Sequence, residues 1–405
     1  MGPLHGIKVL DMTSVMMGPF ATQALGDWGA DILKVESPEG DLTRQIAPAA
    51  IPGMGAIYVN ANRNKRSICL DLKKPGGREA LLKLAAQCDV LAYNIRPQAM
   101  ERLGLGYDAI KAVNPKIIYA GVYGFGQDGP YAKKPAYDDL IQGGAGIPAL
   151  AARASRDGQP RYAPFALADR SVGFSAIGVI CAALFARERT GKGQRVDVPM
   201  FETMVNMVMG DHMAGLTFVP AMDKGGYARQ ISPDRRPYQT KDGYVCALIY
   251  GDKHWKNFFE AIDRMDLWAD DRFNTFAGRA RNIDHVYAEI AEIFKTRSST
   301  EWLKILEDAD IPCMPMHDLQ SMMDDPHLVA TGFFQTVEHP ALGAMKTMRP
   351  AMHFSETPAS IDRLAPTLGE HGIEILRENG VSDEEIAKLR ESGVLIVPDA
   401  PTPAI

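Results

Sequence analysis

Short apolar runs alternate with amphipathic segments through the first half of the chain. Compact runs rich in β-branched residues predict strands, whereas apolar residues spaced three and four apart predict helices. We expect strands at 7–11, 31–36, 67–72, 89–94 and 116–123, and helices at 19–28, 77–87 and 96–103. Strands that alternate with helices of this length predict an α/β fold built on a parallel, doubly wound sheet.

The pattern changes after Gly193, where a strand (196–199) and a Met-rich helix (201–216) are expected. A stretch rich in Gly, Pro and charge follows and predicts a linker or a loop beside the active site. Later segments predict a strand at 244–249, helices at 254–263, 282–294 and 300–307, strands at 334–338 and 345–350, a helix opening at 369–372, and a fraying tail from Pro398. We therefore expect a large domain from 1–218, a linker and small α+β domain from 219–330, and a return to the large domain from 331–405.

Composition narrows the class of protein. Hydrophobic residues make up 46% of the 405 residues and charged residues 23%, which is typical of a globular protein in solution. The formal net charge of −6 argues against a nucleic-acid binder, which would need a basic face. The N-terminus lacks the basic and apolar regions of a signal peptide, and no apolar run reaches the roughly 18 residues of a membrane span. We expect a cytoplasmic protein with neither a nucleic-acid nor a membrane partner.

The five cysteines are scattered, with no CxxC pair among them. This usage predicts reduced thiols in the cytosol rather than a disulfide framework, and it offers no recognisable zinc site. We expect no bound metal.

Asp169 is the most informative single residue, because it directly precedes the apolar-periodic stretch 172–189. A carboxylate there faces unpaired N–H groups at the start of a helix, where the helix dipole favours negative charge. One interpretation is a simple helix N-cap. The other is an ionised nucleophile that attacks an acyl carbon and forms a covalent intermediate.

Familiar cofactor and hydrolase motifs are missing. The glycines at 121, 124, 126 and 129 have the wrong spacing and order for a dinucleotide-binding GxGxxG. Around Ser175, Ile177 stands where the GxSxG nucleophile elbow needs glycine. No histidine lies between His5 and His212, so proton transfer in the first half would have to use carboxylates, Lys or Tyr.

Basic residues follow several expected strands, in the clusters 64–66, 73–74, and 96 with 102. Open α/β sheets hold ligands at the carboxyl ends of their strands, and fixed cations there suit a polyphosphate. Solvated surface charge is the alternative, above all for Lys73 and Lys74.

The chain resembles the family III CoA-transferases, which include formyl-CoA transferase, L-carnitine CoA-transferase and α-methylacyl-CoA racemase. The opening Leu10-Asp11-Met12-Thr13 and the segment Asn64-Lys65-Arg66-Ser67 carry part of the likeness. Further motifs follow in family order, so that the resemblance spans nearly the whole chain, at 18–19, 25–36, 67–73, 94–104, 137–139, 169, 190–198, 242–244 and 368–371.

The resemblance implies a Rossmann-like large domain built from both chain ends, a smaller α+β domain, and an interlocked homodimer. It places the catalytic carboxylate at Asp169 and implies no tightly bound cofactor, with coenzyme A entering as the acyl-CoA substrate. The positions that match the family's CoA contacts are Met16, Met17, Leu70, Leu72, Lys73, Asn94, Ile95, Arg96, Arg102, Lys134 and Tyr137.

The implied activity moves CoA from an acyl-CoA to a free carboxylic acid through an aspartyl anhydride and an aspartyl thioester, and the acceptor could be a dicarboxylate. Backbone N–H groups of the turn 124–129 are candidate donors to the oxyanion. The alternatives are an acyl-CoA racemase, which Tyr137 disfavours because that branch has a histidine there, and a non-catalytic CoA-binding protein. The four-glycine run of formyl-CoA transferase is absent, which weakens oxalate as acceptor. Arg235 and Arg236 could bind an acceptor carboxylate or pair with Asp234 and Asp242.

Overall fold

The computed structural model describes residues 1–398, which form two compact units. The first unit combines residues 1–142 and 164–204 with the described residues from 327 onward, and the second combines 143–163 with 205–326. These two compact units are divided at other residues than the expected domain boundaries at 218 and 330. The expected domain boundaries stay a prediction. Of the tail expected to fray, residues 399–405 lie outside the described residues.

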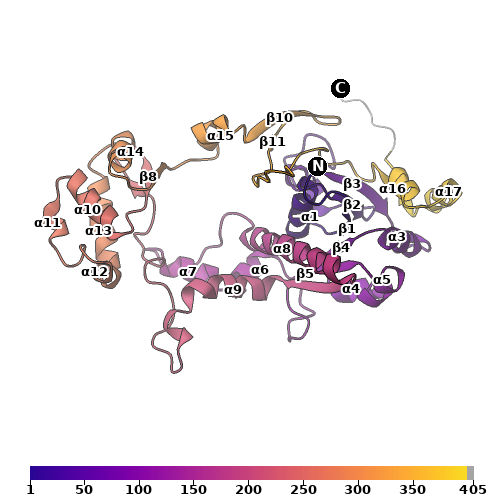
Figure 1. Cartoon of the computed structure of the whole chain (residues 1–405), viewed down its shortest axis with the longest axis horizontal. Coiled ribbons are helices and arrows are strands. Elements are labelled where there is room, and N and C mark those ends of the chain that lie inside the picture. Colours follow the sequence, from indigo (N-terminus) through magenta and orange to yellow (C-terminus); the bar gives the residue numbers. More distant parts are fainter. Residues whose placement is uncertain (399–405) are drawn as a thin grey trace. The chain divides into compact units, whose positions relative to one another are not determined.

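A seven-stranded sheet forms the centre of the first unit (Figure 1). Six of its strands are parallel, in the order β3-β2-β1-β4-β5-β6, as the alternating sequence pattern predicts. The seventh strand, β12, pairs antiparallel with β3, so a wholly parallel sheet is the wrong expectation at this edge. The strands are β1 (Lys8–Met12), β2 (Asp31–Glu36), β3 (Lys65–Leu70), β4 (Val90–Tyr93), β5 (Ile118–Tyr123), β6 (Gln194–Pro199) and β12 (Leu395–Ile396).

Helices cover both faces of this sheet (Figure 1). On one face, α1 (Met17–Asp27) and α8 (Leu167–Thr190) pack against each other. On the other face, an apolar core joins Leu10 and Leu33 to leucines and isoleucines of four helices. These helices are α3 (Gly77–Ala86), α5 (Tyr107–Val113), α16 (Gly372–Glu378) and α17 (Asp383–Glu391).

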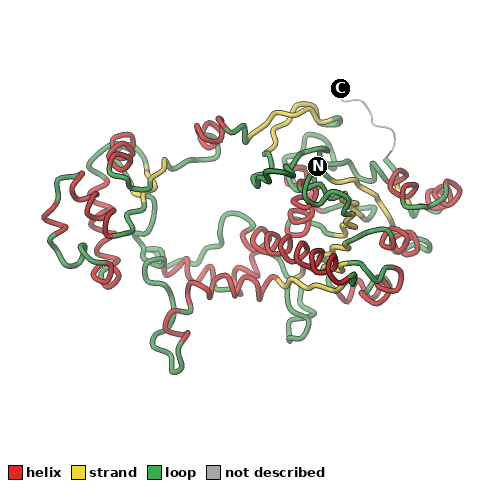
Figure 2. The backbone as a smooth tube through the Cα atoms, in the orientation of Figure 1, coloured by secondary structure: helices red, strands yellow, loops and turns green. Residues whose placement is uncertain are grey.

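Shorter elements connect and extend this layered unit (Figure 2). The helix α6 runs across the division into the second unit at residue 142, and α9 runs across the division at residue 204. The elements are η1 (Leu42–Gln45), α2 (Ala56–Val59), α4 (Pro97–Arg102), α6 (Asp138–Gly144), α9 (Met200–His212), α15 (Pro326–Ala330), β10 (Phe334–His339) and β11 (Gly343–Met348).

The second unit holds a three-stranded antiparallel sheet beside a cluster of helices. Its core is largely aromatic, with Phe258 and Trp302 fully buried. Its elements are α7 (Ile147–Arg153), η2 (Ala214–Thr217), β7 (Tyr238–Gln239), β8 (Tyr244–Ala247), α10 (Asp252–Ala261), α11 (Met265–Trp268), α12 (Phe276–Arg281), α13 (Ile283–Phe294), α14 (Ser299–Asp308), β9 (Cys313–Pro315) and η3 (Ser321–Asp324).

The helix α8 is longer than its sequence pattern predicts. It spans 24 residues and begins at Leu167 rather than near Val172, so by length and composition it is a candidate membrane span, contrary to the sequence-based expectation. In the first unit it packs against α1, β5 and β6, and 44% of its most apolar window is buried. Core helices of globular proteins meet the same criteria, so α8 is weak evidence for a membrane.

Candidate active site

The loops that carry most of the predicted CoA-contact residues lie at one edge of the large sheet. Because β1, β3, β4 and β5 are parallel, the loops after them leave the same carboxyl edge. The N-terminus of α8 belongs to this edge as well, since α8 leads through a short turn into parallel strand β6. At its other end Arg187 pairs at 2.8 Å with Asp89, which directly precedes β4.

Hydrogen bonds tie these loops together. Asn94 after β4 accepts from the Ser14 N–H at 2.9 Å and donates its side-chain amide to the Ser14 carbonyl at 2.7 Å. Arg96 donates to the Lys133 carbonyl at 3.4 Å, which ties the β4–α4 turn to the loop after β5. In that loop the Lys134 ammonium lies 3.8 Å from the ring centre of Tyr131.

The predicted CoA-contact residues differ in exposure. The side chains of Met17 and Leu70 are buried, so these two residues could contact a ligand mainly through their backbone atoms. The half-buried members are Met16, Leu72, Asn94 and Ile95, and the exposed members are Lys73, Arg96, Arg102, Lys134 and Tyr137. The exposed set supplies four cations to this edge, which suits a ligand with several phosphates.

Asp169 is the third residue of α8, and the N-cap is Ala166. The N-cap interpretation of Asp169 is therefore wrong. The capping acceptor is instead Asp138, whose carboxylate accepts from the Asp169 backbone N–H at 2.9 Å. This capping role of Asp138 leaves no signal in the sequence, because only the fold brings two positions 31 residues apart together.

The electrostatics of Asp169 also differ from the expectation of a carboxylate simply stabilised by a helix end. Burial, followed by the neighbouring Asp138 charge, raises the pKa of Asp169 to about 6, and Arg170 opposes the rise. The side chain makes no ion pair with any Lys or Arg among the described residues. At neutral pH the Asp169 carboxylate is mostly ionised and more basic than an ordinary aspartate. No described Lys or Arg pairs with it.

A glycine allows α1 to approach α8 one turn beyond Asp169. A Cβ on Gly173 would lie 2.9 Å from both the Met17 carbonyl oxygen and the Phe20 ring. The Phe20 ring also packs edge-on against Phe174 at 4.8 Å and lies under the Arg170 guanidinium at 4.7 Å. The first turn of α1, with its predicted CoA contacts, is thereby fixed beside the start of α8.

The family model of CoA-transferase family III matches residues 4–372. The chain belongs to this family.

Curated relatives cover almost all of this CoA-transferase. It is 34% identical to an acyl-CoA transferase of Fusarium pseudograminearum, over 97% of this chain and 88% of the relative. It is 31% identical to human succinyl-CoA:glutarate CoA-transferase, over 97% and 90% of the two chains. It is 33% identical to formyl-CoA:oxalate CoA-transferase of Rhodopseudomonas palustris, over 98% of each chain.

Solved structures share the fold. A CAIB/BAIF family protein from Brucella suis matches with a TM-score of 0.77 and 33% identity, over 93% of this chain and 99% of that one. Rv3272 from Mycobacterium tuberculosis matches with a TM-score of 0.78 and 29% identity, over 92% and 98% of the two chains. The protein is a CoA-transferase that uses CoA thioesters as substrates and moves CoA between acyl-CoA and acids.

Two residues of the basic cluster 64–66 have structural roles in this CoA-transferase. Lys65 is fully buried and pairs with Asp11 at 3.0 Å, and burial lowers the pKa of Lys65 to about 8. Arg66 pairs with Asp31 of β2 and with Glu374 of α16. Both therefore hold the fold together, and a phosphate-binding role for them is wrong.

Some backbone groups of the glycine-rich turn after β5 already make hydrogen bonds within the protein. The Gly126 N–H donates to the Glu202 carboxylate at 2.9 Å, so this donor is occupied. The Gly124 carbonyl accepts from the Phe201 N–H and thereby fixes the turn on the start of α9.

Arg235 and Arg236 of the second unit differ in their ion pairs. Arg236 pairs with Asp234 at 3.2 Å, and Arg156 binds both oxygens of the same carboxylate at 2.7 Å. Asp242 pairs with neither predicted arginine, because its carboxylate accepts from the Ser299 N–H and the Thr240 hydroxyl. Within residues 1–398, Arg235 makes no salt bridge and is exposed.

Proposed function

We propose that Asp169 is the nucleophile of this CoA-transferase. The observation that carries the proposal is its position: a half-buried carboxylate without an ion-pair partner among the described residues, at the start of α8 and at the sheet edge that gathers the matched CoA contacts. The pKa of about 6 supports the role, since the group is ionised at neutral pH yet basic enough to attack an acyl carbon.

The proposed reaction balances through four acyl transfers. Asp169 attacks the donor thioester carbonyl and expels CoA thiolate, which leaves a mixed anhydride. The thiolate then attacks the aspartyl carbonyl, releases the donor acid and forms an aspartyl-CoA thioester. The acceptor carboxylate next attacks the aspartyl-CoA thioester and expels CoA thiolate, which leaves a second mixed anhydride. The thiolate then attacks the acceptor's acyl carbon, so a new acyl-CoA leaves and the Asp169 carboxylate is regenerated.

We propose a dicarboxylate such as succinate as the acceptor. Relatives named for glutarate and for oxalate support this class of acid.

We further propose that the eleven matched positions named above contact CoA, and that the enzyme is a cytoplasmic homodimer. The four exposed cations at the carboxyl edge support phosphate binding. The five free cysteines support a reducing compartment. Exposed aromatic side chains on α8 support a contact with a second copy.

Replacement of Asp169 tests the chemistry. We expect Asp169→Ala to abolish transfer of isotope label between an acyl-CoA and its free acid, by at least about three orders of magnitude. Mass spectrometry of wild-type protein incubated with a panel of acyl-CoAs should detect an adduct on the peptide containing residue 169.

Glu188→Gln is the matched control, because Glu188 is an exposed carboxylate on the same helix. It should retain both the adduct and label exchange. Retained exchange in a folded Asp169→Ala protein would remove Asp169 from the role, and deuterium wash-in at the α-carbon without acceptor acid would point to the racemase instead.

A further inference from the structure

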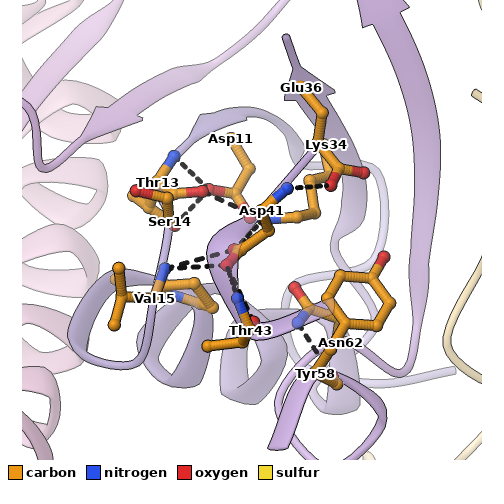
Figure 3. A network of polar contacts seen from close by, with 12 residues as sticks. Asp11, Thr13, Ser14, Val15, Lys34, Glu36, Asp41, Thr43, Tyr58 and Asn62 are labelled. Carbon is orange, nitrogen blue, oxygen red and sulfur yellow. Dashed lines mark hydrogen bonds and ion pairs between the residues drawn. The ribbon is translucent and has the colours of Figure 1, made fainter. Parts of the chain in front are cut away.

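Successive residues of the loop between β1 and α1 are each held by a side chain from a different part of the first unit. Thr13 donates its N–H at 2.9 Å and its hydroxyl to Asp11 at the end of β1 (Figure 3). Ser14 exchanges two hydrogen bonds with the Asn94 amide after β4. The loop is thus fixed from two neighbouring strands before α1 begins.

Val15, the next residue, adopts a backbone conformation that its side chain disfavours. Its φ is 69°, in the left-handed region that β-branched residues rarely enter. Its N–H points at the Asp41 carboxylate, 3.2 Å from each oxygen (Figure 3). Such a conformation persists only where the surroundings impose it. Asp41 is the group positioned to do so.

Asp41 is itself firmly held. Its side chain is fully buried and pairs with the Lys34 ammonium at 3.1 Å. It also accepts from the Thr43 N–H at 3.0 Å and the Thr43 hydroxyl at 2.7 Å. Burial alone would raise the pKa of Asp41, but Lys34 and the Thr43 hydrogen bonds lower it below the ordinary value. Lys34 closes the network by donating to the Thr13 carbonyl at 2.9 Å.

A buried ion pair of this kind contributes little net stability compared with apolar packing, because both charges lose their hydration. Such a pair can instead fix one backbone conformation. Here it fixes the conformation of Val15. The next two residues, Met16 and Met17, are proposed CoA contacts at the first turn of α1. The Met17 carbonyl lies against Gly173, one turn beyond Asp169.

We propose that Asp41 is a positioning residue that holds Val15 in its left-handed conformation and so preorganises the 13–17 loop for the CoA thioester. The inference rests on the proposed CoA contacts. A preformed loop binds more tightly because the cost of ordering it is met during folding rather than on binding. Loss of the Asp41 charge should therefore weaken binding of CoA more than it slows the chemistry.

Asp41→Asn in the full-length enzyme tests this role. We expect the KM for the acyl-CoA and the Kd for free CoA, measured by titration calorimetry, to rise at least tenfold, with kcat within about threefold of wild type. Adding Val15→Gly should restore most of the affinity, because glycine adopts a φ near 69° without a side-chain penalty.

Asp27→Asn is the matched structural control. Asp27 is also a buried carboxylate, pairs with Arg63 at 2.7 Å, and lies at the far end of α1. It should lower the melting temperature without changing the KM. Should Asp41→Asn fail to fold, Thr43→Val removes one hydrogen bond to Asp41 and keeps Lys34, and a two- to fivefold rise in KM is then expected.

An unchanged KM in folded Asp41→Asn, or no rescue by Val15→Gly, would overturn the proposal. Amide hydrogen exchange separates this failure from a failure of the proposed function. If wild-type protein does not bind CoA, the proposed CoA contacts are wrong. The role of Asp41 then depends on whether Asp41→Asn accelerates exchange of the Val15 N–H and Asp27→Asn does not.

Discussion

Two carboxylates, Asp138 and Asp169, lie close together at the start of α8 and have different hydrogen-bond partners. Asp138 accepts from the Asp169 N–H through one oxygen and from the Gln142 amide, at 2.5 Å, through the other. Within residues 1–398 the Asp169 carboxylate has no such hydrogen-bond partners, and its pKa rises to about 6. The residue that caps the helix thus also adjusts the basicity of the proposed nucleophile.

Asp138→Asn should lower the pKa of Asp169, because an amide keeps the capping hydrogen bond and removes the charge. Asp169 attacks only when ionised, so activity falls as the pH drops through its pKa. With a pKa of about 6, roughly one-tenth of Asp169 is ionised at pH 5. The acid limb of single-turnover acyl transfer should therefore shift to lower pH in the variant, with a several-fold gain at pH 5 relative to each protein's own plateau.

The control for this shift is Glu188→Gln on the same helix, which should leave the acid limb near pH 6. An acid limb that does not move in Asp138→Asn would show that another group controls the pH dependence.

Residue identity allowed part of this site to be predicted. Asp169 could be singled out because a carboxylate precedes an apolar-periodic stretch. The matched motifs supply the proposed CoA contacts, which stay a prediction. The role of Asp138 could not, since a hydrogen bond across 31 residues leaves no local pattern. The buried pairing of Lys65 was likewise hidden, because a lysine in a strand reads as a surface cation until its partner, Asp11, is known.

At the scale of elements, sequence periodicity predicted long, regular segments well and their ends less well. β2 matches its expected range, and α3 differs by one residue at its end. The start of α8 was missed by five residues, because Ala166–Asp169 lacks a side-chain N-cap and its capping group comes from elsewhere. Short helices such as α6 and α7 carry too few turns for a periodic signal.

Gly173→Ala tests the contact between α1 and α8. The new methyl group would lie 2.9 Å from the Met17 carbonyl and the Phe20 ring, so α1 must shift. We expect a net loss of about 1–3 kcal/mol in the free energy of unfolding, measured with urea, together with a higher KM for the acyl-CoA.

Gly178→Ala is the matched comparison on the same helix, where a Cβ would meet nothing within 4 Å. It should stabilise the protein by up to about 1 kcal/mol through helix propensity and leave the KM unchanged. Equal effects of the two substitutions would show that the close approach at Gly173 does not matter.

At the scale of the whole molecule, both ends of the described chain meet in one sheet. β12 pairs with β3, Leu395 opposite Leu70, and Arg66 joins β2 to Glu374 and Glu378 of α16. The resemblance implied this return of the chain. A two-residue strand such as β12, however, is too short to be predicted from its own sequence, and only its pairing with β3 defines it.

The exposed face of α8 leads to a prediction about assembly. Phe174 and Phe185 lie eleven residues apart, three turns along one side of the helix, and are 52% and 64% exposed. A contiguous exposed apolar patch is typical of an interaction surface. In the proposed homodimer this face is where a second copy would bury apolar area.

We therefore expect wild-type protein to be a dimer at micromolar concentration by light scattering, and Phe185→Glu to shift it toward monomer. A charge introduced into an apolar contact loses its hydration without gaining a partner. A Phe185→Glu protein that dimerises as tightly as wild type would place the subunit contact on another surface, because a buried glutamate could not be accommodated at equal affinity.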